Sequence, residues 1–348
     1  MSRPVLEVRE LRAHIGTPRG TVRAVDGVSL TVGHAQALGV VGESGSGKSV
    51  MARAVMGLLP PTAASSGAVL FQGRDLLTLS RKERAQVWGK QIAMVFQDPG
   101  RSLNPVVRVE RQLTEGMRKQ LGVGRSEART RALDLLREVG VPDPERRLRA
   151  YPHELSGGMR QRVMIATALA CEPDLLIADE PTTALDVTVQ RQILDLLRRV
   201  QRDRGMSLVL ISHDLAVVAG RTDRVAVMYA GRLAETGATR SVFDAPRHRY
   251  TRALLESTPT LGHERHTPLR LIPGALPDPT RPPEGCRFAP RCAYAAVDCG
   301  RLAPQLSPAG PDHHVACVHP AHEATPPASA PVSAPPSTLA PGGEPHGR

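Results

Sequence analysis

The stretch Gly42-Glu43-Ser44-Gly45-Ser46-Gly47-Lys48-Ser49 sets the architecture of this 348-residue chain. It follows a short apolar run at Ala37–Val41 and precedes a helical pattern at residues 49–59. Glycines let the backbone curl so that successive N–H groups point at phosphate oxygens, and the helix start adds positive charge. Lys48 would contact the β- and γ-phosphates, and the Ser49 hydroxyl would bind Mg²⁺. A flexible Gly/Ser-rich turn is the alternative, but the flanking strand and helix favour a phosphate-binding loop.

Further apolar runs predict the rest of a buried parallel sheet. They lie at residues 92–96, 175–178 and 208–211, and an amphipathic helical pattern at Val187–Arg204 separates the last two. Strand, helix and strand in this order form parallel strands joined by a crossover helix. These patterns indicate an α/β domain over residues 1–245. Its remaining predicted elements are two strands and a mostly helical region, at residues 6–11, 22–32 and 98–170.

Two adjacent carboxylates, Asp179 and Glu180, follow the apolar run at residues 175–178. Side chains alternate along a strand, so the two carboxylates should diverge. Asp179 can then join the Mg²⁺ ligands while Glu180 faces the water that attacks the γ-phosphate. An Asp-Glu pair at a surface turn is the alternative, but a phosphate loop on the same predicted sheet favours a catalytic role.

A second glycine-containing helix start lies between these two sites, in Leu155-Ser156-Gly157-Gly158-Met159-Arg160-Gln161. Taken alone, it is either an ordinary helix cap or another anion-binding helix N-terminus. With this segment in place, the sequence resembles the ABC ATPases. Three further matches carry the resemblance: Gln97 of the glutamine loop, Asp186 in Ala184-Leu185-Asp186 of the aspartate loop, and His213 of the switch histidine.

The resemblance implies a P-loop NTPase domain of the ABC type, with a parallel sheet core, an antiparallel β subdomain and a helical subdomain inserted at about residues 98–170. It also implies that two such domains close head to tail around two ATP molecules. The signature segment of each chain would then complete the site of the other. The implied roles are catalysis by Glu180, His213 and Gln97, Mg²⁺ binding by Ser49, Gln97 and Asp179, ATP binding by residues 42–49 and Asp179, and contact in trans by Ser156, Gly157, Gly158 and Gln161.

Residues 246–322 resemble the C-terminal extension of oligopeptide and dipeptide importers. The match rests on His248-Arg249-Tyr250-Thr251, Ile272-Pro273-Gly274 and the segment from Gly285 to Cys292, although Arg249 stands where those importers carry proline. This resemblance implies an ATPase that powers peptide uptake, with nickel chelates or another solute as the alternative. Its implied partners are two transmembrane permease subunits, a second ABC ATPase (a homologue or another copy) and, indirectly, an external solute-binding protein. The chain would then lie at the cytoplasmic face of the inner membrane.

Four cysteines lie in this extension with the spacing C-x5-C-x6-C-x17-C: Cys286, Cys292, Cys299 and Cys317. Four thiolates suit tetrahedral zinc or an iron–sulfur cluster, but the C-x2-C pair common in zinc sites is missing. Resemblance to the importer ATPases implies a [4Fe–4S] cluster. Zinc and an unmetallated or disulfide-paired set are the alternatives.

Composition bears on two other classes of protein, those that bind nucleic acid and those that span a membrane. Aromatic residues make up only 3% of the chain, which disfavours a nucleic-acid reader built on stacked aromatics, although the net charge of +11 would suit nucleic acid. A soluble ABC ATPase acting on nucleic acid or ribosomes is therefore a distant alternative, and we expect no nucleic-acid partner. No stretch of about 18 apolar residues predicts a membrane helix. Residues 323–348 are Pro/Ala/Ser-rich, so we expect a disordered tail.

One departure from the ABC ATPases concerns the base of the nucleotide. Those ATPases often stack adenine on an aromatic residue ahead of the phosphate loop, and Gly20-Thr21-Val22-Arg23-Ala24-Val25 contains none. An apolar contact from Val22, or stacking of the Arg23 guanidinium on the base, could replace it.

Overall fold

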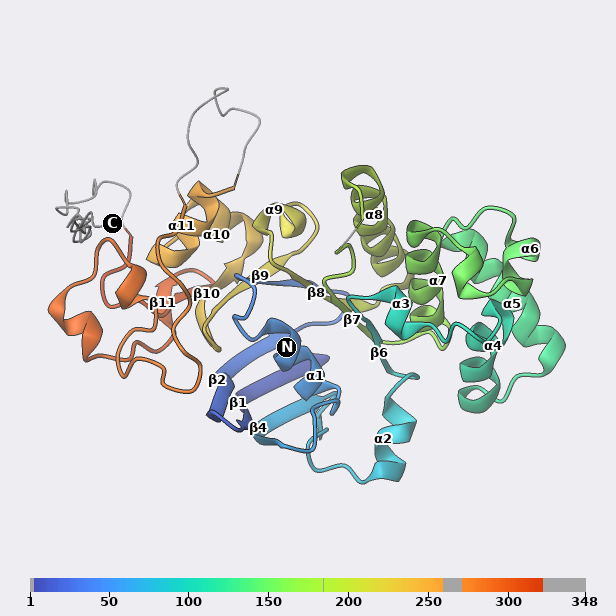
Figure 1. Ribbon diagram of the computed structural model, residues 1–348, viewed down its shortest axis with the longest axis horizontal. Coiled ribbons are helices and arrows are strands. Elements are labelled where there is room, and N and C mark those ends of the chain that lie inside the picture. The colour runs from blue at the N-terminus through green and yellow to red at the C-terminus, as the bar shows by residue number, and fades with distance from the viewer. Residues whose placement is uncertain (1–2, 184, 259–270, 322–348) are drawn as a thin grey trace, which may run out of the picture.

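Two β-sheets with surrounding helices make up the fold of the computed structural model (Figure 1). The structure describes residues 3–183, 185–258 and 271–321. Ala184 of the predicted aspartate loop and the predicted tail at residues 323–348 lie outside the described residues.

The larger sheet has the strand order β11-β12-β10-β9-β3-β8-β7-β6. Its strands from β9 to β6 are parallel neighbours, which confirms the parallel core. Every residue of β3, β7 and β8 is buried, as expected where both faces of a parallel sheet are covered. The elements of this part are β3 (Ala37–Val41), β6 (Ile92–Val95), β7 (Leu175–Asp179), α8 (Val187–Arg204), β8 (Ser207–Ser212), α9 (Leu215–Val218), β9 (Arg224–Tyr229), β10 (Arg232–Ala238) and α10 (Thr239–Asp244).

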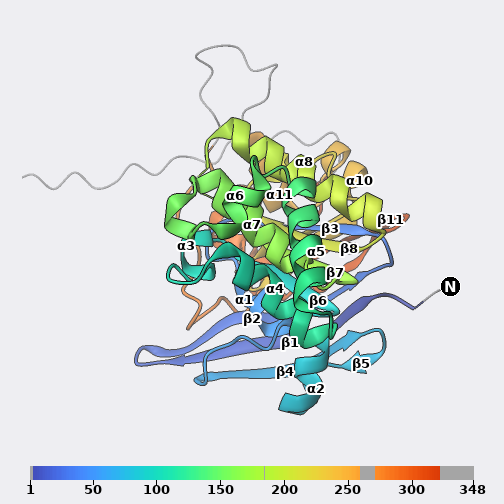
Figure 2. The same ribbon diagram turned by 90° about the vertical axis from the view of Figure 1, so that its right-hand side faces the viewer.

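The smaller sheet is antiparallel, has the order β2-β1-β4-β5 and lies below the larger one in Figure 2. Its buried Val8 and Leu11 belong to the same apolar cluster as Met51 and Val55 of α1 (Lys48–Val55). Helix α1 is therefore packed against this sheet, and that packing holds the phosphate loop in place. The other elements here are β1 (Leu6–Thr17), β2 (Gly20–Val32), β4 (Ala63–Phe71), β5 (Arg74–Asp75) and α2 (Arg81–Val87).

A helical subdomain follows β6, in the region predicted to be helical (Figure 1). Leu113, Leu136 and Ile165 are fully buried in its core. Helix α7 also contacts β6, so it links this subdomain to the main sheet. The helices are α3 (Pro99–Ser102), α4 (Val109–Gln120), α5 (Arg125–Glu138), α6 (Pro144–Arg149), the 3-10 helix Pro152–Glu154, and α7 (Gly157–Leu169).

The C-terminal extension adds two strands to the main sheet. Strand β12 (His313–Val315) pairs with β10, and β11 (Ser307–Gly310) pairs with β12. Helix α11 (Arg249–Glu256) carries the fully buried Tyr250, whose ring lies 4.6 Å from the ring of Tyr229 on β9. The extension also holds the 3-10 helices Ala289–Arg291 and Val297–Gly300. Because its strands belong to the main sheet, the division of the chain at residue 245 stays a prediction.

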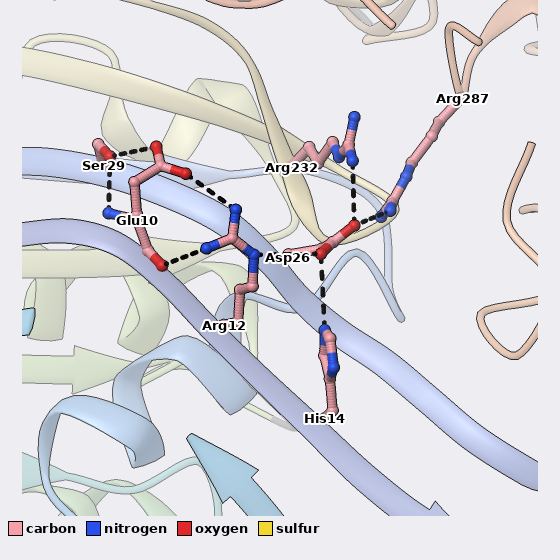
Figure 3. A network of polar contacts seen from close by, with 7 residues as sticks. All are labelled: Glu10, Arg12, His14, Asp26, Ser29, Arg232 and Arg287. Atoms are coloured by element: carbon pink, nitrogen blue, oxygen red, sulfur yellow. Dashed lines mark hydrogen bonds and ion pairs between the residues drawn. The ribbon is translucent and has the colours of Figure 1, made fainter. Parts of the chain in front are cut away.

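A buried carboxylate joins the two sheets and the extension (Figure 3). Asp26 on β2 accepts hydrogen bonds from Arg232 of β10, at 3.1 Å, and from Arg287 of the extension. Burial alone would raise the pKa of Asp26, but the two guanidinium groups outweigh it and hold the pKa below its usual value. The His14 ring lies 3.5 Å from the same carboxylate. Asp26 therefore anchors the extension beside the first residues of the ATPase fold.

No helix in the described part of the chain is both long and apolar enough to cross a membrane.

Candidate nucleotide-binding site

The phosphate loop connects β3 to α1 and depends on glycine at two positions. Gly42 has φ 152° and Gly47 has φ 102°. A Cβ added at Gly42 would lie 2.1 Å from the Met228 carbonyl oxygen, and one at Gly47 would lie 2.2 Å from that of Ala24. Only glycine fits these approaches, so the chain can curl as the motif predicted.

Lys48 begins α1 and points back into the loop. Its side chain is 3% exposed, and Nζ donates to the carbonyl oxygens of Gly42, at 2.7 Å, and Glu43, at 2.9 Å. Burial lowers the pKa of Lys48, and the nearby Glu180 and Asp179 carboxylates oppose that shift. These neutral oxygen atoms hold the ammonium group in place, and its positive charge can attract a phosphate anion.

Asp179 and Glu180 diverge as predicted, but β7 ends at Asp179, so the positive φ of Glu180 and not alternation along the strand separates the two side chains. Asp179 is 1% exposed, and its Oδ1 accepts a hydrogen bond of 2.7 Å from the Ser49 hydroxyl. Burial raises the pKa of Asp179, against the hydrogen bond from Ser49. The adjacent carboxylate and hydroxyl oxygens are a donor set that suits Mg²⁺.

Glu180 lies on the other side, within a cluster of polar groups. Its Oε2 accepts hydrogen bonds from Gln97 Nε2, at 3.0 Å, and from the Thr183 hydroxyl, at 3.1 Å. The Nδ1 atom of His213 lies 3.4 Å from the same oxygen. The positive φ of 44° at Glu180 turns its side chain toward these partners, a backbone conformation rare outside glycine. The structure thus brings Gln97, Glu180 and His213 together and adds Thr183, which sequence reasoning missed.

The signature segment lies apart from the phosphate loop of the same chain. Ser156 is exposed and caps α7 by accepting a hydrogen bond of 3.3 Å from the Met159 N–H. Gly157 is exposed and Gly158 half-buried, whereas Gln161 is 1% exposed and its Nε2 has no hydrogen-bond partner within the described residues. The Gln161 side chain is enclosed within its own chain, and its contact with a second chain stays a prediction.

Asp186 has a local structural contact. Its carboxylate caps α8 by accepting a hydrogen bond of 2.9 Å from the Val189 N–H. Val189 in turn lies near the signature segment, since a Cβ added at Gly158 would be 3.0 Å from its Cγ1. Asp186 therefore positions the start of α8 behind the exposed signature residues.

A cavity of about 1100 Å³ opens over the phosphate loop. No residue of the signature segment is among the described residues that line it. Of the twelve residues predicted for ATP binding or catalysis, seven line it: Ser44, Gly45, Gly47, Lys48, Ser49, Gln97 and Glu180. The extension supplies one wall, which sequence reasoning missed: Leu276, Pro277, Asp278, Pro279, Thr280 and Arg281.

The extension also touches the loop directly. The Arg291 guanidinium contacts the Glu43 carboxylate at 2.7 and 3.1 Å, and the Tyr250 hydroxyl accepts a hydrogen bond of 2.8 Å from the Glu43 N–H. Glu43 thus faces the extension and is absent from the described lining of the cavity, whereas the sequence placed it with the ATP-binding residues.

The four cysteines of the extension are free thiols, and burial raises the pKa of three of them, Cys286, Cys292 and Cys317. Nearby backbone N–H groups oppose this rise in the pKa of the three thiols, an effect that would stabilise thiolate ligands. Among the described residues, no three of the four sulfurs lie within 4.8 Å of one another. Tetrahedral zinc would require sulfurs about 3.8 Å apart, given Zn–S bonds of about 2.3 Å.

A phosphate loop after β3, an acidic pair at the end of β7 in the same parallel sheet, and an inserted helical subdomain together define a P-loop NTPase of the cassette type. Comparison with known proteins agrees: residues 25–183 match the family model described as ABC transporter, and residues 234–299 match that of the oligopeptide/dipeptide transporter C-terminal region. The chain belongs to the ABC transporter ATP-binding family, within its oligopeptide/dipeptide branch.

Individual relatives extend these matches over most of the chain. A putative peptide import ATP-binding protein of Brucella melitensis is 49% identical, over 88% of this chain and 92% of that protein. The dipeptide transport ATP-binding protein of Escherichia coli is 47% identical, over 92% and 98% of the two chains. A dimeric ATP-binding cassette in a post-hydrolysis state, bound to ADP and Pi, is 27% identical with a TM-score of 0.61, over 68% of this chain and 99% of that one.

Proposed function

We propose that this chain binds and hydrolyses ATP to drive the uptake of dipeptides or oligopeptides across the cytoplasmic membrane. The observation that carries the ATPase role is the shared cavity in which Lys48 and Ser49 face Gln97 and Glu180. The peptide substrate is supported by the relatives, whose names specify peptide or dipeptide import, and by the match of the extension.

Glu180 is the residue that polarises the attacking water and accepts its proton. Gln97 and Thr183 hold Oε2 of Glu180 in place, and the nearby His213 can orient the same carboxylate. Lys48 and the backbone N–H groups of the loop bind the β- and γ-phosphates. Ser49, Gln97 and Asp179 would hold Mg²⁺, which neutralises charge on the phosphates.

A second ATPase chain completes the site. Ser156 and Gly157 are exposed at the N-terminal end of α7, away from the cavity of their own chain. The N–H groups at such a helix start bind anions, so this surface can contact the nucleotide held by a partner. The dimeric state of the related cassette supports this arrangement. The partner is a homologue or another copy of this chain.

The four cysteines hold a [4Fe–4S] cluster in this proposal. The sulfurs are spread too widely for tetrahedral zinc, yet Cys286 and Cys299 are near enough to Cys292 for their charges to raise its pKa, in addition to the effect of burial. Four irons placed between the thiolates require that wider spacing. The cluster has a structural role, tying together the loops of an extension that has little apolar core.

Two permease subunits and an external solute-binding protein complete the importer, and this chain lies at the cytoplasmic face of the inner membrane. The experiment that tests the function is uptake of a labelled dipeptide by the assembled importer in liposomes. We expect uptake to require ATP on the side of this chain and to be lost with Lys48→Ala. ATP-dependent uptake of a nickel chelate, with no response to any peptide, would reassign the solute. Absence of ATP-dependent transport would contradict the proposal.

A further inference from the structure

The nucleotide cavity has one wall that no motif of the ATPase domain accounts for. This wall, residues 276–281, belongs to the extension and lies beside Arg23 of β2, which lines the same cavity together with Val22. Among the described residues that line the cavity, none is aromatic. The base of a bound nucleotide therefore needs an apolar surface other than an aromatic ring.

The wall runs from the phosphate loop to the start of β2. At one end, Cδ1 of Leu276 lies 3.5 Å from where a Cβ on Gly45 would be. At the other end, the Arg23 N–H donates to the Pro279 carbonyl at 3.0 Å, and Thr280 lies next to Gly20. The wall thus spans the distance from the phosphate-binding N–H groups to the segment where an aromatic residue for the base would have been expected.

The wall is held in shape by its own contacts. The Asp278 carboxylate accepts hydrogen bonds from the N–H and the hydroxyl of Thr280, at 2.8 and 2.7 Å. Just before the wall, Arg291 Nε donates to the Pro273 carbonyl at 2.8 Å. Leu276 is half-buried and packs against the main apolar core, so its side chain presents a fixed apolar surface to the cavity.

We propose that this wall is the adenosine-binding surface of the ATP site, with Leu276 as the specificity-determining apolar contact at the end of the wall nearest the phosphate loop, in the cavity that Val22 also lines. The inference rests on the proposed ATPase function and adds to it the residues that bind the nucleoside. A purine is flat and largely apolar on its faces, so burying it against leucine and valine side chains favours binding without a stacked ring. The phosphates are bound separately by the loop and Lys48.

The test compares ATP with inorganic tripolyphosphate, which has the phosphates but no nucleoside. We expect Leu276→Ala to weaken ATP binding about tenfold, from loss of the buried apolar contact. Tripolyphosphate affinity should stay unchanged, and Leu276→Met should restore ATP binding. The matched control is Leu271→Ala, a leucine of the same extension that is 80% exposed and does not line the cavity.

Unchanged ATP affinity in Leu276→Ala would overturn the inference. Equal weakening of ATP and tripolyphosphate would also overturn it, because Leu276 would then only support the loop. If Leu276→Ala does not fold, Leu276→Asn, which has the same branching of heavy atoms as leucine but is polar, carries the same expectation. A wild-type protein that binds neither ligand would instead contradict the proposed function, so the two failures are distinguishable.

Discussion

Arg291 of the cysteine-containing extension donates two hydrogen bonds, of 2.7 and 3.1 Å, to the carboxylate of Glu43 in the phosphate loop. The Arg291 side chain is only 7% exposed, and it precedes Cys292 directly. The phosphate loop and the cysteine-containing loop are therefore in direct contact, and a shift of one would displace the other. The extension acts as part of the scaffold of the nucleotide site.

Arg291→Met should weaken both the fold and nucleotide binding. Glu43 would keep a partly buried carboxylate without its partner, at a cost of about 1–3 kcal/mol in the free energy of unfolding. The stability and ATP affinity of Arg291→Lys should lie between those of wild type and Arg291→Met, because an ammonium group cannot contact both carboxylate oxygens as the guanidinium does. Denaturant unfolding and ATP titration measure the two effects. The control is Arg301→Met, an exposed arginine of the same extension; equal behaviour of the two variants would refute the coupling.

His248 should make stability depend on pH. Burial lowers its pKa to about 4, against the pull of the Glu235 carboxylate, and its Nδ1 accepts a hydrogen bond of 3.0 Å from the Tyr250 N–H. The unfolded chain binds a proton below the ordinary value of 6.5, whereas the folded chain does so only below about 4. Stability should therefore fall as pH drops from 6.5 to 4, by up to about 1.4 kcal/mol per pH unit from this group.

Denaturant unfolding of wild type and His248→Gln between pH 7 and pH 4 checks this prediction. The variant starts less stable, because it loses a helix cap, but its stability should decline less steeply. His153→Gln changes an exposed histidine and should keep the wild-type slope. If the free energy of unfolding depends on pH with the same slope in all three proteins, the prediction for His248 is contradicted.

Cys292→Ser should remove the metal from the extension. One of four ligands is lost, so iron content and the visible absorbance of the anaerobically purified protein should collapse and the thermal midpoint should drop. Cys171→Ser changes a cysteine that is buried in the helical subdomain and should retain the metal. Zinc in place of iron in the wild type, or a Cys292→Ser protein with unchanged metal and midpoint, would contradict the cluster.

The sequence was sufficient to predict the parts of the site that lie at the ends of strands. The phosphate loop and the Asp179-Glu180 pair each follow a short apolar run, and a local pattern of this kind reports local geometry. Helix boundaries were less certain. The helix predicted at residues 49–59 ends at Val55. Gly57 has φ 61°, and a Cβ atom added there would lie 2.4 Å from the Trp88 ring, so the helix cannot continue through this position.

The role of the extension could not be predicted from the sequence. Arg291 and Glu43 are 248 residues apart, and no local pattern marks their contact. Strands β11 and β12 are four and three residues long and lack an alternating apolar pattern. Their place in the main sheet depends on the pairing of β12 with β10 and of β11 with β12. The wall at residues 276–281 has no regular secondary structure, and only the folded chain brings it over the phosphate loop.

The most direct test of the ATPase mechanism is phosphate release by the assembled importer that contains this chain or its Glu180→Gln variant, with ATP affinity measured on the same samples. We expect wild-type protein to hydrolyse ATP and the variant to lose at least about 100-fold in rate, because the proton acceptor is gone. ATP affinity should be retained, and Glu127→Gln, an exposed change on α5, should leave both values unaltered. A Glu180→Gln protein that hydrolyses ATP at the wild-type rate would contradict the central claim.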